Sequence, residues 1–177
     1  ILNESLIQID WGKYTESVAR IHRQLEDANN EMTGWLNSPL ENNVEMVELI
    51  QRTAYEIKVM ADVLVVIGVG GSFLGAKAIQ DALTPYFGNG NNGVEVVYVG
   101  QNISGAYIRQ LLNSLEQKEV YVNVIPKSGK TMEQALAFRV FRQYMEKRYG
   151  VEANNRITVT TDAEKGLLKE IAQNSGY

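Results

Sequence analysis

Four short apolar segments alternate with four longer amphipathic ones along residues 63–173, and this alternation limits the fold more than any other feature of the sequence. The apolar segments are rich in β-branched residues, which is typical of strands buried on both faces of a parallel sheet. They lie at 63–67, 94–99, 119–125 and 156–160, with helices expected at 72–87, 104–115, 131–149 and 162–173. Because connections between parallel strands are right-handed, this order predicts a three-layer α/β/α fold around a mostly parallel sheet.

The residues before the first strand have a different pattern, because their apolar residues recur at intervals of three and four. This spacing predicts amphipathic helices over 13–29 and 43–60. We therefore expect an N-terminal helical arm at 1–60, followed by the α/β domain at 61–177.

The last expected helix carries end signals at both sides. Asp162 is a good N-cap, and Gly176 has the position of a residue that ends a helix in the left-handed conformation. Tyr177 is placed to begin a fifth strand, so we expect the α/β domain to be cut short at its C-terminus.

Composition argues against several classes of function. The chain has a net charge of −4, no basic stripe and no cysteine, so we expect no nucleic-acid partner, disulfide or thiolate chemistry. It has no apolar run of about 18 residues and no signal peptide at its start, so we expect no membrane partner and a cytoplasmic location. The single histidine, His22, lies in a mixed-charge helical stretch and is interpreted as a surface or packing residue.

A glycine-rich loop, Gly68-Val69-Gly70-Gly71-Ser72, follows the first strand directly. Ligands of open α/β sheets bind where strands end and helices begin. We expect the amides of Gly71 and Ser72, with the Ser72 hydroxyl, to face an anion there. The alternative is a tight turn without a ligand, although such a turn seldom needs three glycines and a serine in five residues.

Two other phosphate-binding loops do not fit this segment. A dinucleotide fingerprint needs a third glycine where Phe73 stands, and the second strand ends without an acidic residue for the ribose. A P-loop needs lysine where Ala76 stands. A dinucleotide-dependent oxidoreductase is therefore the weakest alternative.

The loop after the third strand is Lys127-Ser128-Gly129-Lys130-Thr131. It offers two hydroxyls, two ammonium groups and successive amides at the start of a helix, which suits a phosphate group. The alternative is that Thr131 only caps the helix and the lysines are solvated. Because both loops leave the same edge of the expected sheet, we predict that they form one phosphate site.

Several segments, taken in order, closely resemble the bacterial glucose-6-phosphate isomerase family, and the likeness extends over nearly the whole chain. These segments are 33–39, 66–77, 98–104, 123–139 and 158–166. The resemblance implies a sugar isomerase (SIS) domain with a flavodoxin-like parallel core. It also implies that the full-length enzyme is a homodimer and needs no metal or organic cofactor.

The resemblance further implies a reaction and a binding site. Enzymes of the family interconvert glucose 6-phosphate and fructose 6-phosphate, opening the ring and moving a proton between C1 and C2 through a cis-enediol. By motif match, Gly71 and Ser72 face the substrate, Ser128 and Thr131 hold its phosphate, and Lys127 also belongs to the site.

Two residues depart from the family pattern at the second loop. The family usually has serine before the lysine, where this chain has Pro126, and threonine two places after Ser128, where it has Lys130. Pro126 removes one hydroxyl and one amide. We expect weaker phosphate binding, or compensation by the charge of Lys130.

No catalytic residue is assigned. The glutamate, histidine and lysine of the family follow its first SIS domain, His22 matches none of them, and Glu133 is interpreted as a helix-start or supporting residue. Proton abstraction from C2 requires a base within hydrogen-bond reach. We therefore expect an N-terminal domain fragment that binds a phosphosugar but is inactive alone. The alternative is a stand-alone SIS module that binds phosphosugars as a regulatory sensor.

Overall fold

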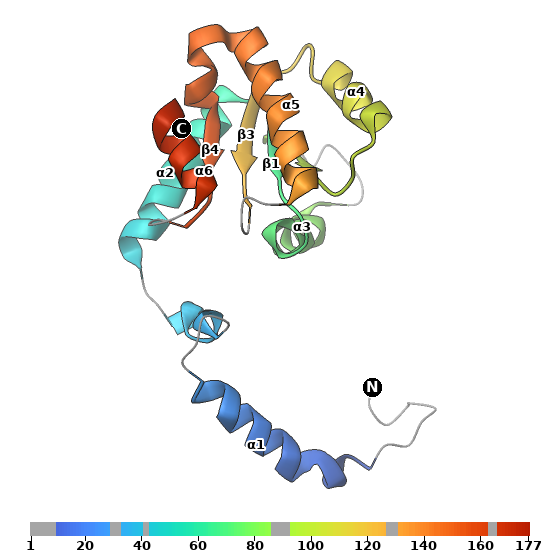
Figure 1. Ribbon diagram of the computed structural model, residues 1–177, viewed down its shortest axis with the longest axis vertical. Coiled ribbons are helices and arrows are strands. Elements are labelled where there is room, and N and C mark those ends of the chain that lie inside the picture. Colours follow the sequence, from blue (N-terminus) through green and yellow to red (C-terminus); the bar gives the residue numbers. More distant parts are fainter. Residues whose placement is uncertain (1–9, 29–32, 41–42, 86–92, 127–130, 163–165) are drawn as a thin grey trace. The chain divides into compact units, whose positions relative to one another are not determined.

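The computed structural model describes residues 10–28, 33–40, 43–85, 93–126, 131–162 and 166–177 (Figure 1). The chain divides into two compact units, Ile1–Glu48 and Leu49–Tyr177. The expected boundary between an arm and a domain at residue 60 stays a prediction.

The described part of the first unit is helical. It contains the 3₁₀ helix η2 (Trp11–Tyr14), α1 (Thr15–Glu26), the short 3₁₀ turns η3 (Gly34–Leu36) and η4 (Ser38–Leu40), and the start of α2 (Val44–Met60). Asp10 begins η2, since its side chain accepts a hydrogen bond from the Gly12 amide at 3.2 Å. The helix expected from residue 13 therefore begins with a 3₁₀ turn and becomes α-helical at Thr15.

The second unit contains a four-stranded, all-parallel sheet, which confirms the predicted fold class. Its strands pair in the order β2-β1-β3-β4. They are β1 (Val63–Ile67), β2 (Glu95–Val99), β3 (Val120–Val124) and β4 (Ile157–Val159). Each lies within two residues of its predicted bounds, because strands covered on both faces need continuous apolar sequence.

Helices cover both faces of this sheet. They are α3 (Gly71–Leu83), α4 (Gly105–Ser114), α5 (Met132–Tyr149) and α6 (Leu167–Ser175). The helices α4, α5 and α6 lie on the near face in Figure 1, and residues of all three pack against the main buried cluster. The helix α3 contacts the other face, where the Phe73 and Tyr98 rings lie 5.4 Å apart. The helices on the two faces and the sheet between them make the three layers.

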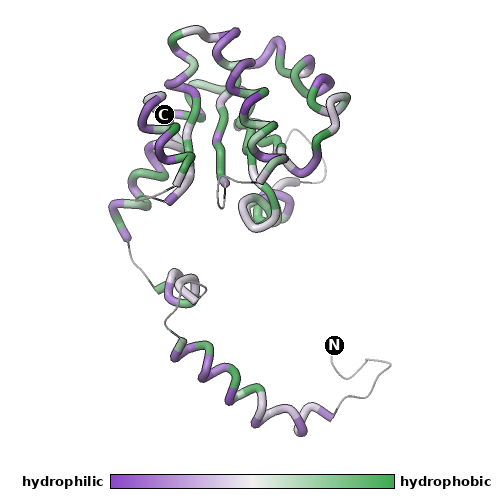
Figure 2. The backbone as a smooth tube through the Cα atoms, viewed as in Figure 1, coloured by the Kyte–Doolittle hydropathy of each residue, from purple (hydrophilic) through white to green (hydrophobic). Residues whose placement is uncertain are grey.

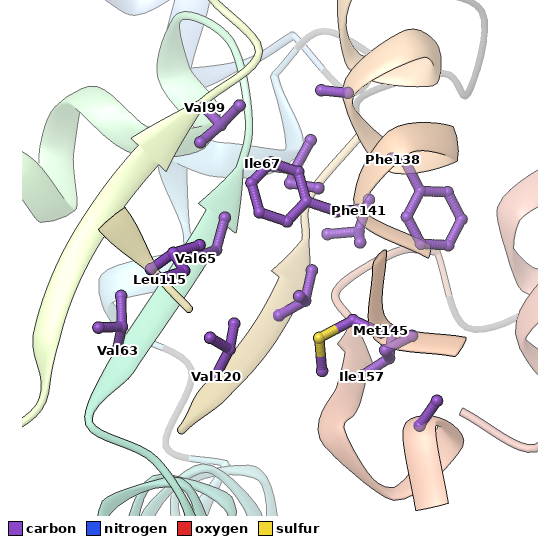
Figure 3. Close-up of a cluster of buried hydrophobic side chains, with 14 of the residues drawn as sticks. Val63, Val65, Ile67, Val99, Leu115, Val120, Phe138, Phe141, Met145 and Ile157 are labelled. Atoms are coloured by element: carbon purple, nitrogen blue, oxygen red, sulfur yellow. The ribbon is translucent and has the colours of Figure 1, made fainter. Parts of the chain in front are cut away.

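The main core lies between the sheet and α5. Hydrophobic sequence is concentrated on the strands, while the helices alternate between hydrophobic and hydrophilic residues (Figure 2). The Phe141 side chain is fully buried, and its ring points toward β1 and Ile67, whereas the Phe138 ring points the other way (Figure 3). Phe138 therefore contributes to the packing between α5 and α6.

The helix α6 begins later than expected, and it ends at the expected glycine. The helix begins at Leu167 after Gly166, whose φ is 117°, and not at Asp162. Gly176 ends it in the left-handed conformation, and its amide donates to the Ala172 carbonyl at 2.8 Å. Tyr177 does not begin a strand, because its amide donates to the same carbonyl at 3.0 Å.

Two kinds of feature are absent from the described residues. None of the helices seen there combines the length and the apolar character that crossing a bilayer requires. No group of three or more His, Asp or Glu side chains in those ranges could hold a metal ion.

Candidate functional site

The strand order reverses at one place along the carboxyl edge of the sheet. The chain runs from β1 to β2 on one side and then crosses back to β3 on the other side of β1. Ligands of open α/β sheets bind at this kind of reversal. The two strand ends are tied together there, because the Ile125 amide donates to the Ile67 carbonyl at 2.9 Å. The loops that follow β1 and β3 therefore start side by side.

Two glycines in the first loop are needed for backbone reasons. A Cβ on Gly68 would lie 3.0 Å from the Ser72 Cβ, which is too close for an unstrained contact. Gly70 has a φ of 58°, a conformation that residues with a side chain rarely adopt. Together they turn the chain from β1 directly into α3, which begins at Gly71.

The start of α3 has one amide and one hydroxyl that no described residue engages. The Ser72 amide is engaged in the turn, since it donates to the Val69 carbonyl at 3.2 Å. Within the described residues, the Gly71 amide has no backbone acceptor and the Ser72 hydroxyl has no hydrogen bond. Of the two amides expected to face an anion, Gly71 is the one left for a ligand. The helix N-terminus adds a partial positive charge of about half a unit.

The second loop lies partly outside the described residues, and the undescribed part includes Lys127 and Ser128 of the predicted site. Thr131 is described and is the N-cap residue of α5. Its side chain makes no capping hydrogen bond, although its carbonyl accepts from the Ala135 amide at 3.0 Å. The hydroxyl of Thr131 thus does not serve the helix in the way that the alternative interpretation supposed.

The described site residues belong to two helices that begin at the same edge of the sheet. Gly71 and Ser72 open α3 on one face, and Thr131 precedes α5 on the other. Both N-termini adjoin the reversal between β1 and β3, so their dipoles favour an anion there. These three residues supply neither an acid nor a base, and the prediction that the two loops share one phosphate site stays a prediction.

The structure adds Gln134, a residue that the sequence analysis missed. It is only 5% exposed, and its Nε2 donates to the Ile125 carbonyl at 3.3 Å. Because Ile125 is thereby held through both its amide and its carbonyl, Gln134 fixes the backbone that enters the second loop. A signal was present in the sequence, since Gln134 interrupts an apolar stripe at helical spacing with Ala137, Phe138 and Phe141.

Neither His22 nor Glu133 lies in surroundings that would support catalysis. His22 lies on the exposed surface of α1, with its Nε2 3.3 Å from Glu26 Oε1. Glu133 is half-buried in the first turn of α5. These positions agree with the surface and helix-start interpretations.

The sequence of the chain is similar to those of bacterial glucose-6-phosphate isomerases. The profile of the family described as "Phosphoglucose isomerase" matches residues 22–172. The chain is 44% identical over 172 residues to a glucose-6-phosphate isomerase of Alkaliphilus metalliredigens (strain QYMF), covering 94% of this chain. It is 45% identical over 166 residues to that of Staphylococcus aureus (strain NCTC 8325 / PS 47), covering 92% of this chain.

Two solved structures have folds similar to that of this chain. A hypothetical protein of Thermus thermophilus superposes with a TM-score of 0.79 at 27% identity, covering 93% of this chain and 38% of its own. A glucose-6-phosphate isomerase of Chlamydia trachomatis D/UW-3/Cx superposes with a TM-score of 0.57 at 25% identity, covering 70% of this chain and 23% of its own.

The chain spans 38% of the length of the two curated relatives described above. The matched family profile covers most of the chain, including both loops at the carboxyl edge of the sheet. The chain therefore belongs to the phosphoglucose isomerase family.

Proposed function

We propose that this chain is the N-terminal phosphosugar-binding portion of an aldose–ketose isomerase that interconverts glucose 6-phosphate and fructose 6-phosphate. The enzyme would be cytoplasmic and homodimeric. The observation that carries the proposal is the start of two helices, α3 and α5, at one reversal of strand order in a chain of this family. The names of the relatives support the choice of substrate.

The proposed role of each site residue follows from its motif match to the family and is compatible with its chemistry. The Ser128 and Thr131 hydroxyls and the Lys127 ammonium group bind the phosphate, while the Gly71 amide and the Ser72 hydroxyl face the sugar. A hydrogen bond to a charged group contributes about 1.5–3 kcal/mol. Two or three such bonds sum to about 3–9 kcal/mol, which corresponds to millimolar to micromolar dissociation constants before the cost of ordering the ligand is subtracted.

Turnover needs a base that these residues do not provide. In the reaction a base removes the proton from C2 of the open-chain aldose, the cis-enediol forms, and the proton is returned to C1. A base must lie within about 3 Å of the proton that it removes. We propose that the base belongs to the part of the relatives' length that this chain does not span, and that the chain alone binds without turnover.

The test is a thermal-shift measurement with fructose 6-phosphate and 6-phosphogluconate. A ligand at about 100 times its dissociation constant stabilises the folded state by roughly 2.7 kcal/mol, which corresponds to about 5–10 °C here. Fructose and gluconate are the controls and should give no shift, because they lack the phosphate. Ser72→Ala combined with Thr131→Ala should abolish the shift; a full response from this double variant would place the site elsewhere.

A coupled isomerase assay separates binding from catalysis. The 177-residue chain should show no turnover above the buffer rate while still giving the thermal shift. Ordinary turnover would refute the assignment of the base to another part of the enzyme. Binding without turnover would also fit the alternative, a regulatory phosphosugar module. Restoration of turnover by adding the remaining portion of a relative would favour the isomerase.

A further inference from the structure

A groove of about 330 Å³ lies between α4 and α5, which cover the near face of the sheet in Figure 1. Each helix lines it with residues that recur at intervals of three and four positions. They are Gly105, Ile108, Arg109 and Leu112 on α4, and Glu133, Leu136, Ala137 and Val140 on α5. Residues at this spacing share one side of a helix, so one side of each helix forms a wall of the groove.

The charged residues of the groove lie near one of its ends. Both helices begin at the carboxyl edge of the sheet, where Glu133 is the second residue of α5 and Arg109 is the fifth of α4. At a rise of 1.5 Å per residue, both lie within about 6 Å of the helix starts along the helix axes. Leu112 and Val140 lie further along the same walls. The groove therefore has a charged end and an apolar end.

The two charged side chains are accessible and uncommitted. Arg109 is exposed and Glu133 is half-buried. Neither side chain forms an ion pair or a hydrogen bond with a described residue, and so they do not pair with each other. A guanidinium group binds a carboxylate in bidentate geometry, and a carboxylate accepts hydrogen bonds from an ammonium group. Opposite charges on the two walls thus match a small ligand that carries both signs.

The remaining wall favours a ligand that also has an apolar part. Ile103 and Leu136 line the groove and are 61% and 45% exposed. Covering such side chains is favourable by about 25 cal/mol for each Å² of apolar surface removed from water. Pockets for drug-sized ligands usually measure about 300–1,000 Å³, so this groove suits a ligand at the small end of that range.

We propose that this groove binds a free α-amino acid with an apolar side chain. The carboxylate of the ligand pairs with Arg109, and its ammonium group pairs with Glu133. Its side chain extends toward the apolar end of the groove, between Ile108 and Leu136. A polar amino acid is disfavoured there, because its side chain would lose hydrogen bonds to water without replacement.

The test is an amide NMR titration of the full 177-residue chain with L-leucine. We expect saturable shifts concentrated in 105–112 and 133–140, with a dissociation constant of about 0.5–5 mM for so few ligand atoms. Isocaproate is leucine without the ammonium group, and isoamylamine is leucine without the carboxylate. Each should bind about three- to tenfold more weakly, because one ion pair is lost. Absence of saturable shifts up to about 20 mM leucine would overturn the proposal.

Variants assign each ion pair to its residue. In Glu133→Gln the preference for leucine over isocaproate should disappear, and in Arg109→Gln the preference for leucine over isoamylamine should disappear. A purely structural role would weaken all three ligands alike. Glu116→Gln and Lys147→Gln make the same charge changes at exposed positions outside the groove and should leave binding unchanged. Preferences that survive in both groove variants would refute the proposed pairing.

Two further measurements exclude other occupants. The described residues of the proposed phosphosugar site, Gly71, Ser72 and Thr131, do not line the groove, so 6-phosphogluconate should not compete with leucine. Competition would place leucine in the phosphosugar site and overturn the proposal, whereas failure of 6-phosphogluconate to bind at all would count only against the proposed function. Concentration-dependent shifts of the groove residues without leucine, lost in Arg109→Gln, would show that a second copy of the chain occupies the groove instead.

Discussion

Three glycines of the first loop and α3 should respond differently to the same added methyl group. Gly68→Ala places a Cβ 3.0 Å from the Ser72 Cβ and 3.5 Å from the Ser72 backbone, so the start of α3 must shift. Overpacking of this kind costs about 1–3 kcal/mol of the free energy of unfolding. At Gly71 and Gly75 a Cβ meets nothing within 4 Å, and both residues are helical. These two substitutions should be neutral or raise stability by up to about 1 kcal/mol.

Ligand binding should distinguish Gly71→Ala from Gly75→Ala, although neither substitution is expected to destabilise the fold. If a phosphosugar approaches the Gly71 amide, a methyl group there obstructs it, and we expect the affinity for fructose 6-phosphate to fall at least about tenfold, or 1.4 kcal/mol. Gly75→Ala is the matched control, because it lies one turn into α3 and should bind normally. Urea unfolding gives the stability and the thermal shift gives the binding. Equal binding by Gly71→Ala and Gly75→Ala would refute the role of the Gly71 amide, and a fully stable Gly68→Ala would refute the contact argument.

Two further predictions concern the core. Tyr149→Phe should cost about 1–3 kcal/mol, because it removes the acceptor of the Val120 amide at 2.9 Å. Burial raises the pKa of Tyr149 above 10, so the contribution of its protonated hydroxyl to stability is fully present below pH 10 and is lost as pH rises through the raised pKa. In urea unfolding above pH 10, Tyr149→Phe should therefore lose less of its free energy of unfolding than the parent does. An identical loss in both proteins would contradict this. Phe141→Ala should lower the free energy of unfolding by about 3–5 kcal/mol, because the Phe141 side chain is fully buried. Leu83 is 79% exposed, so Leu83→Ala should change stability by less than about 0.5 kcal/mol. Equal effects of the two substitutions on unfolding would contradict the assigned core.

The strands were predictable because their surroundings leave little choice of residue. Val63, Val65 and Ile67 are fully buried in the main core, and Val66, which alternates with them along β1, is buried as well. A run such as VLVVI satisfies both faces at once, so its bounds can be read directly from the sequence. Helix ends depend instead on single backbone conformations, and α6 begins where Gly166 turns the chain with a φ of 117°. A suitable cap residue at 162 could not reveal that.

The candidate site was predictable in part for a similar reason. Gly68 and Gly70 follow β1 because a Cβ does not fit at one and a positive φ is needed at the other. Such backbone requirements leave glycines in the sequence, and the loop can be recognised from them. The contact between Gln134 and the Ile125 carbonyl leaves no comparable pattern, because it depends on how α5 packs against the end of β3, which no local sequence rule specifies. Its one sequence signal is a polar residue in an apolar stripe.

The departure at Pro126 changes the chemistry of the second loop and leaves the sheet intact. Ile125, just before it, donates to Ile67 and accepts from Gln134, so the end of β3 is held without any bond from residue 126. The residue before a proline favours extended backbone, which is the conformation that a strand end requires. A proline is tolerated where its missing amide would not belong to the sheet ladder, and β3 ends at Val124. We therefore expect the cost of this departure to fall on phosphate binding, because Pro126 offers the proposed ligand neither an amide nor a hydroxyl.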